Sequence, residues 1–262
     1  MKTVVIGNKY GQLGNRLFSF ANFIGNAIED NYRVINPFFY EYAPYFENCR
    51  NRLIVEFPHK SPLSRLLFLK PLIKKAAMLL SILTNLIGDF SVRKRMVINA
   101  WTQDDRNRIK HADKIRSFFR VTQTHAKQIS EFIRQSRNEY DILVGIHMRL
   151  GDYKTFSGGK FFYTSSQYTT VMKQMLRLFP DKKIGFIICS NETIDVSEFS
   201  GFPVIRGTNH IVEDMYCLAE CDYITGPPST YTMWASFYGK VPLHMLIDIE
   251  REITKDCFSV YL

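Results

Sequence analysis

The sequence lacks several features by which the class of a protein is often recognised. It has no CxxC pair, no GxGxxG or GxxxxGK[ST] loop, no internal repeat and no low-complexity tract. These absences exclude the common fingerprints for dinucleotide and P-loop nucleotide binding, and they exclude a repeat architecture. The 262 residues are 46% hydrophobic and 14% aromatic, so the chain can bury a core as one large domain or two smaller ones.

Cysteines are few, odd in number and set mostly among apolar residues, which predicts buried thiols in a reducing, cytoplasmic setting. Cys217 and Cys221 lie one helical turn apart, but the residues around them do not complete a set of four ligands, so we expect no metal. The apolar stretch at the N-terminus is too short for a signal peptide, and secretion is not expected.

No apolar run is long enough to cross a membrane, because the uncharged stretch from Ala76 to Gly88 falls short of the about 20 residues required. The net charge is +9, and residues 60–120 alone carry 14 lysines and arginines against four acidic residues. Together with an apolar face from Leu66 to Leu86, this charge is typical of a helix lying peripherally on an anionic inner membrane surface. The alternative is a solvated helical face packed on the core.

The two halves of the chain differ in how clearly they show their elements. In the first half we predict a strand at 2–6, a glycine-bearing loop, a helix at 17–28 and a strand at 33–36, followed by a helix near 127–137. The second half alternates short apolar strands at 142–148, 184–189, 204–205, 223–225 and 243–247 with helices at 165–179, 211–219 and 231–238. This alternation predicts an α/β fold with a parallel sheet and helices on both faces.

In such sheets, ligands bind outside the carboxyl ends of the strands. This places the segments HMRLGDY, ICSNE, RGTNH and GPPSTY on one rim. In HMRLGDY, His147 and Arg149 lie on one side of the strand where it leaves the sheet, and Asp152 follows after a glycine. Arginine is well shaped to grip a phosphate, so the pattern predicts a phosphate clamp, with a structural Arg–Asp ion pair as the alternative.

Two further loops carry candidate anion-binding groups. Ser229 and Thr230 precede a helix, where they either cap it or leave backbone amides directed at an anion. Glu213 and Asp214 are either ligand contacts or ordinary first-turn acids. In the first half, GQLGN forms a glycine loop with Gly14 and Asn15.

Three segments resemble the α-1,2-fucosyltransferases of glycosyltransferase family 11 and their superfamily of GDP-fucose enzymes. HMRLGDY is similar to HxRRGDY, YGQLGNRLFSFA to an N-terminal GGLGNQMFQYA block, and EDMYCLAECDYITGPPSTYTMWASFYG to a third block near the C-terminus. The three occur in the family's order and cover roughly half of the chain, whereas residues 37–140 align with nothing in the family. HxRxGD alone is a modest signal, and the combination is specific.

The resemblance implies a GT-B-like fold of two Rossmann-like lobes with a cleft between them. Residues 1–140 would form an acceptor-side lobe with a basic amphipathic insert, and 141–262 a nucleotide-sugar-binding lobe. It also implies GDP-fucose as donor, a glycan acceptor, inversion at the anomeric carbon and no metal or other cofactor. Arg149, His147 and Asp152 would be catalytic. The donor-binding residues would be Gly14, Asn15, Arg16, Asn191, Asp214, Ser229 and Thr230.

The sequence departs from the family pattern where Leu150 replaces a second arginine, Arg16 replaces a glutamine and Met233 replaces a tryptophan. These departures affect the identity of the donor more than they affect the fold. An enzyme of the same fold with another donor or acceptor is therefore an alternative.

A third hypothesis is a basic protein that binds anionic surfaces or nucleic acid. Nucleic acid is not expected, because the aromatic residues do not interleave with the basic ones as a stacking platform requires.

Overall fold

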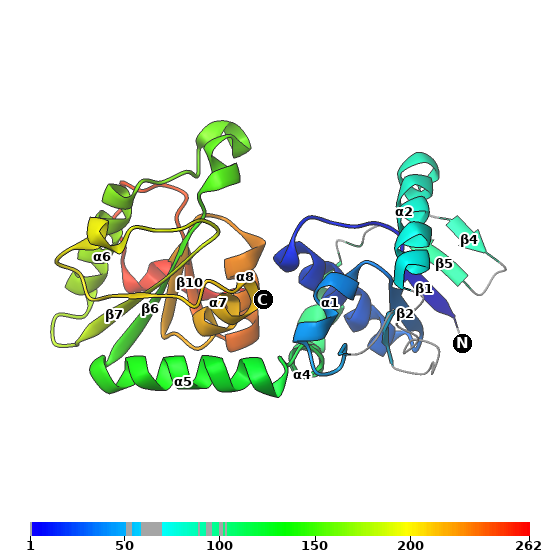
Figure 1. Ribbon diagram of the computed structural model, residues 1–262, viewed down its shortest axis with the longest axis horizontal. Helices are drawn as coiled ribbons and strands as arrows, with labels where there is room; N and C mark the ends of the chain where they lie inside the picture. The colour runs from blue at the N-terminus through cyan, green and yellow to red at the C-terminus, as the bar shows by residue number, and fades with distance from the viewer. Residues whose placement is uncertain are drawn as a thin grey trace. The chain divides into compact units, whose positions relative to one another are not determined.

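The computed structural model describes residues 2–50, 54–58, 70–88, 90–92, 96–99, 102 and 104–262. The chain divides into two compact units, residues 1–124 and 125–262, and each is considered by itself. Both units are built on a sheet with a parallel centre, and Figure 1 labels many of their elements.

The first unit begins with the predicted strand, loop, helix and strand. β1 (Thr3–Ile6) leads through the glycine loop into α1 (Leu13–Glu29), and β2 (Arg33–Asn36) pairs parallel with β1. Helix α1 begins before residue 17, so Gly14 and Asn15 lie in its first turn. Aromatic rings of Phe20, Phe39 and Phe119 pack edge-on and tilted in the core beside it.

The rest of the first unit, which the sequence pattern leaves unordered, completes a five-stranded sheet in the order β3-β2-β1-β5-β4. β5 pairs parallel with β1, while β3 and β4 are antiparallel edge strands. The elements are η1 (Phe39–Glu41), η2 (Ala43–Tyr45), β3 (Val55–Phe57), α2 (Lys70–Ile87), β4 (Phe90–Val92), β5 (Met96–Asn99), α3 (Arg106–Lys110) and α4 (Ala112–Phe118). Residues 60–69, 89, 93–95, 100, 101 and 103 of the predicted basic stretch lie outside the described residues.

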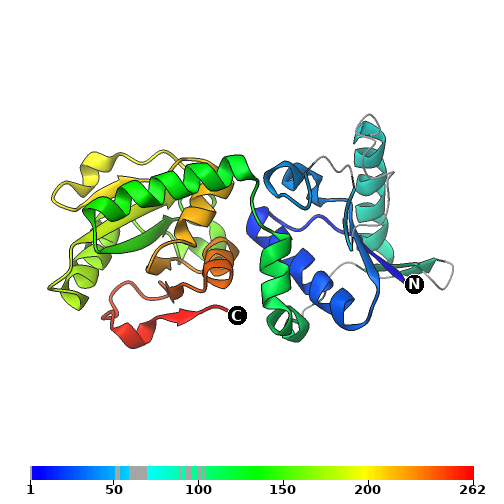
Figure 2. The same cartoon turned by 90° about the horizontal axis from the view of Figure 1, so that it is seen from below.

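The second unit contains a six-stranded sheet in the order β11-β10-β9-β6-β7-β8, and β6 to β10 run parallel. Every strand and helix predicted for this half is present. The elements are α5 (Gln123–Glu139), which enters from the first unit, β6 (Ile142–Met148), η5 (Gly151–Lys154), η6 (Phe156–Gly159), α6 (Ser165–Leu178), β7 (Ile184–Ser190), η7 (Val196–Phe199), β8 (Val204–Arg206), α7 (Ile211–Leu218), β9 (Tyr223–Gly226), α8 (Thr230–Gly239), β10 (Pro242–Met245), η8 (Lys255–Cys257) and β11 (Ser259–Val260). Figure 2 shows β11, in red, at the edge of this unit.

The strands of this sheet are apolar on both faces because helices cover both. On one face, Val144, Ile146 and Met148 join the core formed with α6. On the other face, Gly145 lies against Leu218 of α7, where a Cβ would come within 2.5 Å of the leucine side chain. The His147 side chain continues this second face and therefore lies on the α7 and α8 side of β6.

The strand order reverses between β6 and β9, because the chain runs from β6 outward to β8 and then returns to β9 on the other side. Loops on the two sides of such a reversal diverge and leave room for a ligand at the carboxyl ends of the strands. The segments beginning at His147 and at Gly226 flank this point.

The boundary between the compact units lies at 124/125, at the start of α5, whereas the sequence places it at 140/141, at the end of that helix. In the described part of the chain, no helix combines the length and apolar character that a membrane crossing requires.

Candidate functional site

The site begins where β6 leaves the sheet and Arg149 follows. Arg149 Nη2 donates to Asp152 Oδ2 at 3.0 Å, and Arg149 Nε lies 2.9 Å from Asp152 Oδ1. The guanidinium also lies 5.7 Å from the ring centre of Tyr153. The Arg149 side chain is only 14% exposed, while that of Asp152 is 55% exposed. The predicted ion pair is therefore present, and its carboxylate faces solvent rather than the protein interior.

His147 is buried on the same side of the strand. Its ring stacks on Tyr231 of α8 with 4.9 Å between ring centres. Burial, together with the positive charge of Arg149, lowers the pKa of His147 to about 3, so the imidazole is neutral at physiological pH. Among the described residues, nothing hydrogen-bonds its buried Nδ1 atom. A buried polar atom of this kind is costly unless a ligand or water satisfies it.

The loop after β9 meets the β6 loop directly. A Cβ at Gly226 would lie 2.7 Å from the carbonyl oxygen of His147, so only glycine allows this approach. Tyr153 donates its hydroxyl hydrogen to the Pro228 carbonyl at 2.6 Å. Ser229 caps α8 by accepting from the Tyr231 amide at 3.2 Å, and Thr230 is the first residue of that helix. The loop that leads into α8 therefore lies against the loop that carries Arg149.

Two other predicted residues brace these loops. Asn191 Oδ1 accepts from the Leu150 amide at 2.8 Å and so ties the loop after β7 to the β6 loop. Asp214 is buried in the first turn of α7, and its Oδ1 accepts from the Thr208 hydroxyl at 2.9 Å. Burial raises the pKa of Asp214, although the bonds from the Thr208 side chain and backbone lower it.

The three predicted residues of the first unit lie at the start of α1. Gly14 is buried and Asn15 is half-buried. Arg16 is a buried cation whose contacts lie inside its own unit: Nη1 donates to Glu41 Oε2 at 2.6 Å and to the Phe38 carbonyl at 3.2 Å. The guanidinium also lies 5.0 Å from the Tyr42 ring centre. For Arg16, donor binding stays a prediction.

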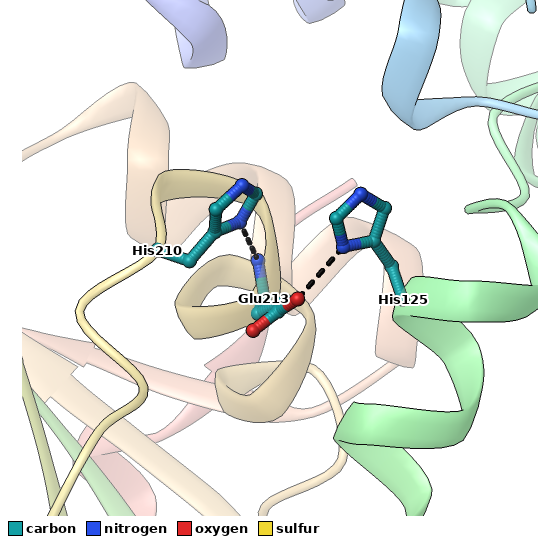
Figure 3. Close-up of side chains that lie close together, drawn as sticks. All are labelled: His125, His210 and Glu213. Atoms are coloured by element: carbon teal, nitrogen blue, oxygen red, sulfur yellow. Dashed lines mark hydrogen bonds and ion pairs between the residues drawn. The ribbon is translucent and has the colours of Figure 1, made fainter.

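His125, His210 and Glu213 form a cluster that sequence reasoning did not assemble (Figure 3). His125 Nδ1 lies 2.7 Å from Glu213 Oε1, and His210 Nδ1 accepts from the Glu213 amide, which caps α7. Burial lowers the pKa of His210; the Glu213 carboxylate raises it, and His125 lowers it further. One ligand atom from each residue lies within 4.8 Å of the others, which is close enough for a shared metal ion.

The orientation of the two rings limits this metal interpretation. The imidazoles stack with an interplanar angle of 23° and 4.9 Å between centres. A ligating nitrogen lone pair lies in the plane of its ring, so two nearly parallel stacked rings do not direct their lone pairs at one point. One ring would have to turn before both could bind the same ion. As it stands, the geometry is that of an ion pair and a helix cap joining α5 to α7.

A cavity of about 390 Å³ lies on the other side of β6, lined by Met148, Leu150 and Tyr163 and by polar residues at the start of α6 and after β7. Because Met148 and Leu150 alternate with His147 and Arg149 along the chain, the cavity lies on the opposite face from the Arg149 site. Its acidic side chains, Glu192, Asp195 and Glu198, make it unsuited to an anionic phosphate.

The fold is similar to those of solved fucosyltransferases. NodZ alpha-1,6-fucosyltransferase soaked with GDP-fucose has a TM-score of 0.59 and 15% identity, over 93% of this chain and 94% of NodZ. NodZ from Bradyrhizobium gives 0.59 and 14% over 95% and 97% of the two chains. A variant of Arabidopsis thaliana FUT1 in complex with GDP gives 0.61 and 12% over 98% and 73%. The chain shares the fold of these fucosyltransferases.

The comparison confirms the predicted α/β, GT-B-like fold class. No protein-family model matches the sequence, and no curated protein sequence matches it either, so assignment to glycosyltransferase family 11 stays a prediction.

In the second unit, the structure gathers Arg149, His147, Asp152, Asn191, Ser229 and Thr230 around the strand-order reversal, with Asp214 buried behind the next loop. Sequence reasoning missed Tyr153 and Tyr231, although both stand within the motifs HMRLGDY and GPPSTY.

Proposed function

We propose that this protein is a glycosyltransferase that moves fucose from GDP-fucose to a sugar hydroxyl, with inversion at the anomeric carbon. The observation that carries the proposal is the meeting of two loops at the reversal of strand order. Arg149, the neutral His147 and the start of α8 lie together there. Among solved proteins of the same fold, NodZ was soaked with GDP-fucose and a FUT1 variant is in complex with GDP, which supports the choice of donor.

Arg149 is proposed to hold the diphosphate of the donor. When the glycosidic bond breaks, negative charge develops on the departing diphosphate, and a preorganised cation with oriented amides stabilises it. Arg149 is held by Asp152 and the Tyr153 ring before any ligand arrives, so its side chain loses little freedom on binding. The first-turn amides of α8 supply further donors to the same anion.

These groups are fixed donors of positive potential, so the proposed transfer does not require a metal ion. Ser229, Thr230 and Asn191 are proposed donor-site residues, and Asp214 is proposed to shape the neighbouring loop through its bond to Thr208. Gly14, Asn15 and Arg16 remain proposed contacts from the first unit. The second unit would bind the nucleotide sugar and the first would face the acceptor.

His147 and Asp152 are proposed to play different parts at the reacting centre. A histidine with a pKa of about 3 is a poor general base at neutral pH, so His147 is assigned to hydrogen bonding beside the donor. Asp152, with its exposed carboxylate, is the better candidate to receive the proton of the acceptor hydroxyl. The same carboxylate binds Arg149 in the absence of a ligand, and an incoming phosphate would displace it from the guanidinium.

A transferase of the same fold with another donor or acceptor is the second candidate function. The replacement of the family's second arginine by Leu150 favours it, because one possible phosphate contact is missing. Such an enzyme would use the same Arg149 chemistry on a different nucleotide sugar.

Thermal unfolding of the full chain tests both candidates, with GDP, GDP-fucose, GDP-mannose and UDP-glucose as probes, each with and without EDTA. A ligand that binds only the folded state at about a hundred times its Kd stabilises it by about 2.7 kcal/mol. We expect GDP and GDP-fucose to raise the Tm equally with and without EDTA. A larger shift with UDP-glucose would favour the second candidate. Absence of a shift with every nucleotide would contradict both, and loss of the shift in EDTA would contradict metal independence.

A further inference from the structure

Helix α2 packs on the first unit through its small and polar side chains. Ala77 and Thr84 are buried. Thr84 Oγ1 donates to the Gly7 carbonyl at 2.8 Å, and Ser81 Oγ donates to Asn8 Oδ1 at 2.8 Å. Asn8 Nδ2 in turn donates to Asn85 Oδ1 at 2.8 Å. Hydrogen bonds to the loop after β1 therefore contribute to fixing which side of the helix faces the protein.

The opposite side of α2 presents large apolar side chains to solvent. Residues 72, 79, 83 and 86 follow one another at helical spacing, and their neighbours widen the stripe. The exposed side chains are Leu72 (65%), Met78 (59%), Leu79 (59%), Ile82 (48%), Leu83 (44%), Leu86 (77%) and Ile87 (67%). A continuous apolar stripe of this kind on a soluble surface marks an interaction site.

This orientation is the reverse of that expected for a helix on the surface of a globular protein, which turns its apolar stripe inward. Helix α6 of the same chain shows the usual arrangement, because Tyr168, Val171, Met172 and Met175 on its apolar side are all buried. The hydrogen bonds of Ser81 and Thr84 hold α2 in the reversed orientation, so its apolar stripe is directed outward by specific contacts.

The charge around α2 indicates what covers the stripe. The helix contains no acidic residue, and its exposed Lys74 and Lys75 lie near the N-terminal end of the apolar stripe. An apolar stripe with lysines at one end and no acidic residue on the same helix complements an anionic phospholipid surface, whereas a second copy of the same basic helix would be repelled.

We propose that α2 lies in the plane of an anionic membrane, with its leucine and isoleucine side chains in the acyl boundary and the lysines at the headgroups. The helix is not long and apolar enough to cross a bilayer, which agrees with an in-plane position. The surface brings the protein to lipid-borne or membrane-adjacent acceptors. Membrane binding through α2 requires no particular sugar donor, so it stands or falls separately from the proposed transferase activity.

Flotation of the full chain with vesicles tests this surface. The vesicles contain phosphatidylcholine alone or with 30 mol% phosphatidylglycerol, a composition of about 30% anionic lipid that approximates a charged leaflet. We expect binding to the anionic vesicles and much weaker binding to the neutral ones. The double substitution Leu79→Glu with Leu83→Glu should lower partitioning at least about tenfold, because it removes apolar area and adds repulsion. Lys74→Gln and Lys75→Gln should each lower it about fivefold.

The matched control is Val196→Glu with Ile247→Glu, which makes the same charge change at exposed apolar side chains of the second unit. This control should bind vesicles within about twofold of the parent. Circular dichroism and Tm check that all variants fold, as expected for substitutions of exposed residues. The proposal is wrong if the parent fails to bind anionic vesicles, or if the control loses as much binding as the α2 variant. It is also wrong if sedimentation shows a dimer that the α2 substitutions dissociate without changing vesicle binding.

Discussion

The two units of this chain each hold an arginine beside a glycine-bearing loop, and they hold it in different ways. Arg16 is 6% exposed and bonds to Glu41, which lies 25 residues away in the sequence. Arg149 is 14% exposed and bonds to Asp152, three residues away and largely open to solvent. Each guanidinium lies over a tyrosine ring, Tyr42 in the first unit and Tyr153 in the second.

The two pairs differ in what they connect: the first joins two elements of its unit, and the second lies within one loop. The Arg16–Glu41 pair joins α1 to η1, so it closes a long loop and fixes two elements of the first unit. The Arg149–Asp152 pair spans a single turn and joins no distant elements. An incoming phosphate can replace an exposed local carboxylate at small cost, because such pairs contribute about 1 kcal/mol or less.

The largest expected effect is the loss of transfer in Arg149→Ala. Removing a group that stabilises transition-state charge typically lowers the rate about a hundred- to a thousandfold. The Tm should change little, because the pair with the exposed Asp152 contributes about 1 kcal/mol or less. GDP formation from GDP-fucose and the Kd for GDP measure the effect.

Arg134→Ala is the matched control for this substitution. Arg134 also pairs with an acidic residue three positions away, Glu131, at 2.7 Å, but it is 61% exposed on α5. The control should keep the parent's activity. Transfer by Arg149→Ala within about threefold of the parent would refute the clamp, since a loss of about a hundredfold or more is expected.

A second prediction concerns stability, for which we expect Arg16 to matter more than Arg149. Arg16→Ala should lower the free energy of unfolding by about 2 kcal/mol, because it removes the donor of the buried Phe38 carbonyl and leaves Glu41 with Lys9 as its remaining cation. Arg149→Ala should cost less than about 1 kcal/mol. Urea unfolding of both variants measures these changes. Equal losses of unfolding free energy would mean that the two ion pairs contribute equally to stability.

The contribution of the Glu41 carboxylate to stability can also be tested by changing the pH. Although burial raises its pKa, hydrogen bonds from Lys9, Arg16 and Tyr40 lower it to about 2, from an ordinary value of 4.5. The folded state therefore binds the proton less tightly than the unfolded state. The stabilisation is fully present above pH 4.5 and is lost as the pH falls toward 2.

Urea unfolding of the parent and of Glu41→Gln at pH 7, 4 and 2.5 measures this contribution. At pH 7 the parent should be more stable by about 1 kcal/mol, a figure reduced for the exposure of Glu41. The difference between the two proteins should shrink as the pH is lowered. A difference that is constant from pH 7 to 2.5 would mean that the charge of Glu41 does not stabilise the first unit.

The second unit is predictable from sequence because each strand is a short apolar run followed at once by polar or glycine residues. The run from Ile142 to Met148 forms β6 with the expected bounds, and the parallel register then brings its end near that of β9. The motifs in these loops could therefore be placed on one rim. The contact between Tyr153 and Pro228 could not, because it depends on the path of both loops after they leave the sheet.

The first unit is less predictable because its sheet is built from strands of three or four residues that are far apart in sequence. β1 pairs with β5 across more than 80 intervening residues, and the edge strands β3 and β4 are too short to show a period. The apolar pattern of α2 does not by itself show which side of the helix packs on the protein, because bonds from Ser81 and Thr84 to the loop after β1 contribute to its orientation. His125 and His210 meet for a similar reason: their proximity follows from the docking of α5 on α7.

The smallest expected effect is on GDP binding by Asp152→Asn, which also tests how Arg149 is held. Asparagine keeps the size of the side chain but removes the charge that competes with phosphate for the guanidinium. GDP should bind roughly fivefold more tightly, since an exposed pair is worth about 1 kcal/mol or less. Glu192→Gln removes a charge from the adjoining loop and controls for the general change in electrostatic potential.

If Asp152 also receives the acceptor proton, Asp152→Asn should bind GDP more tightly yet transfer fucose at least about a hundredfold more slowly. Weaker GDP binding would mean that the carboxylate positions Arg149 for the phosphate rather than competing with it.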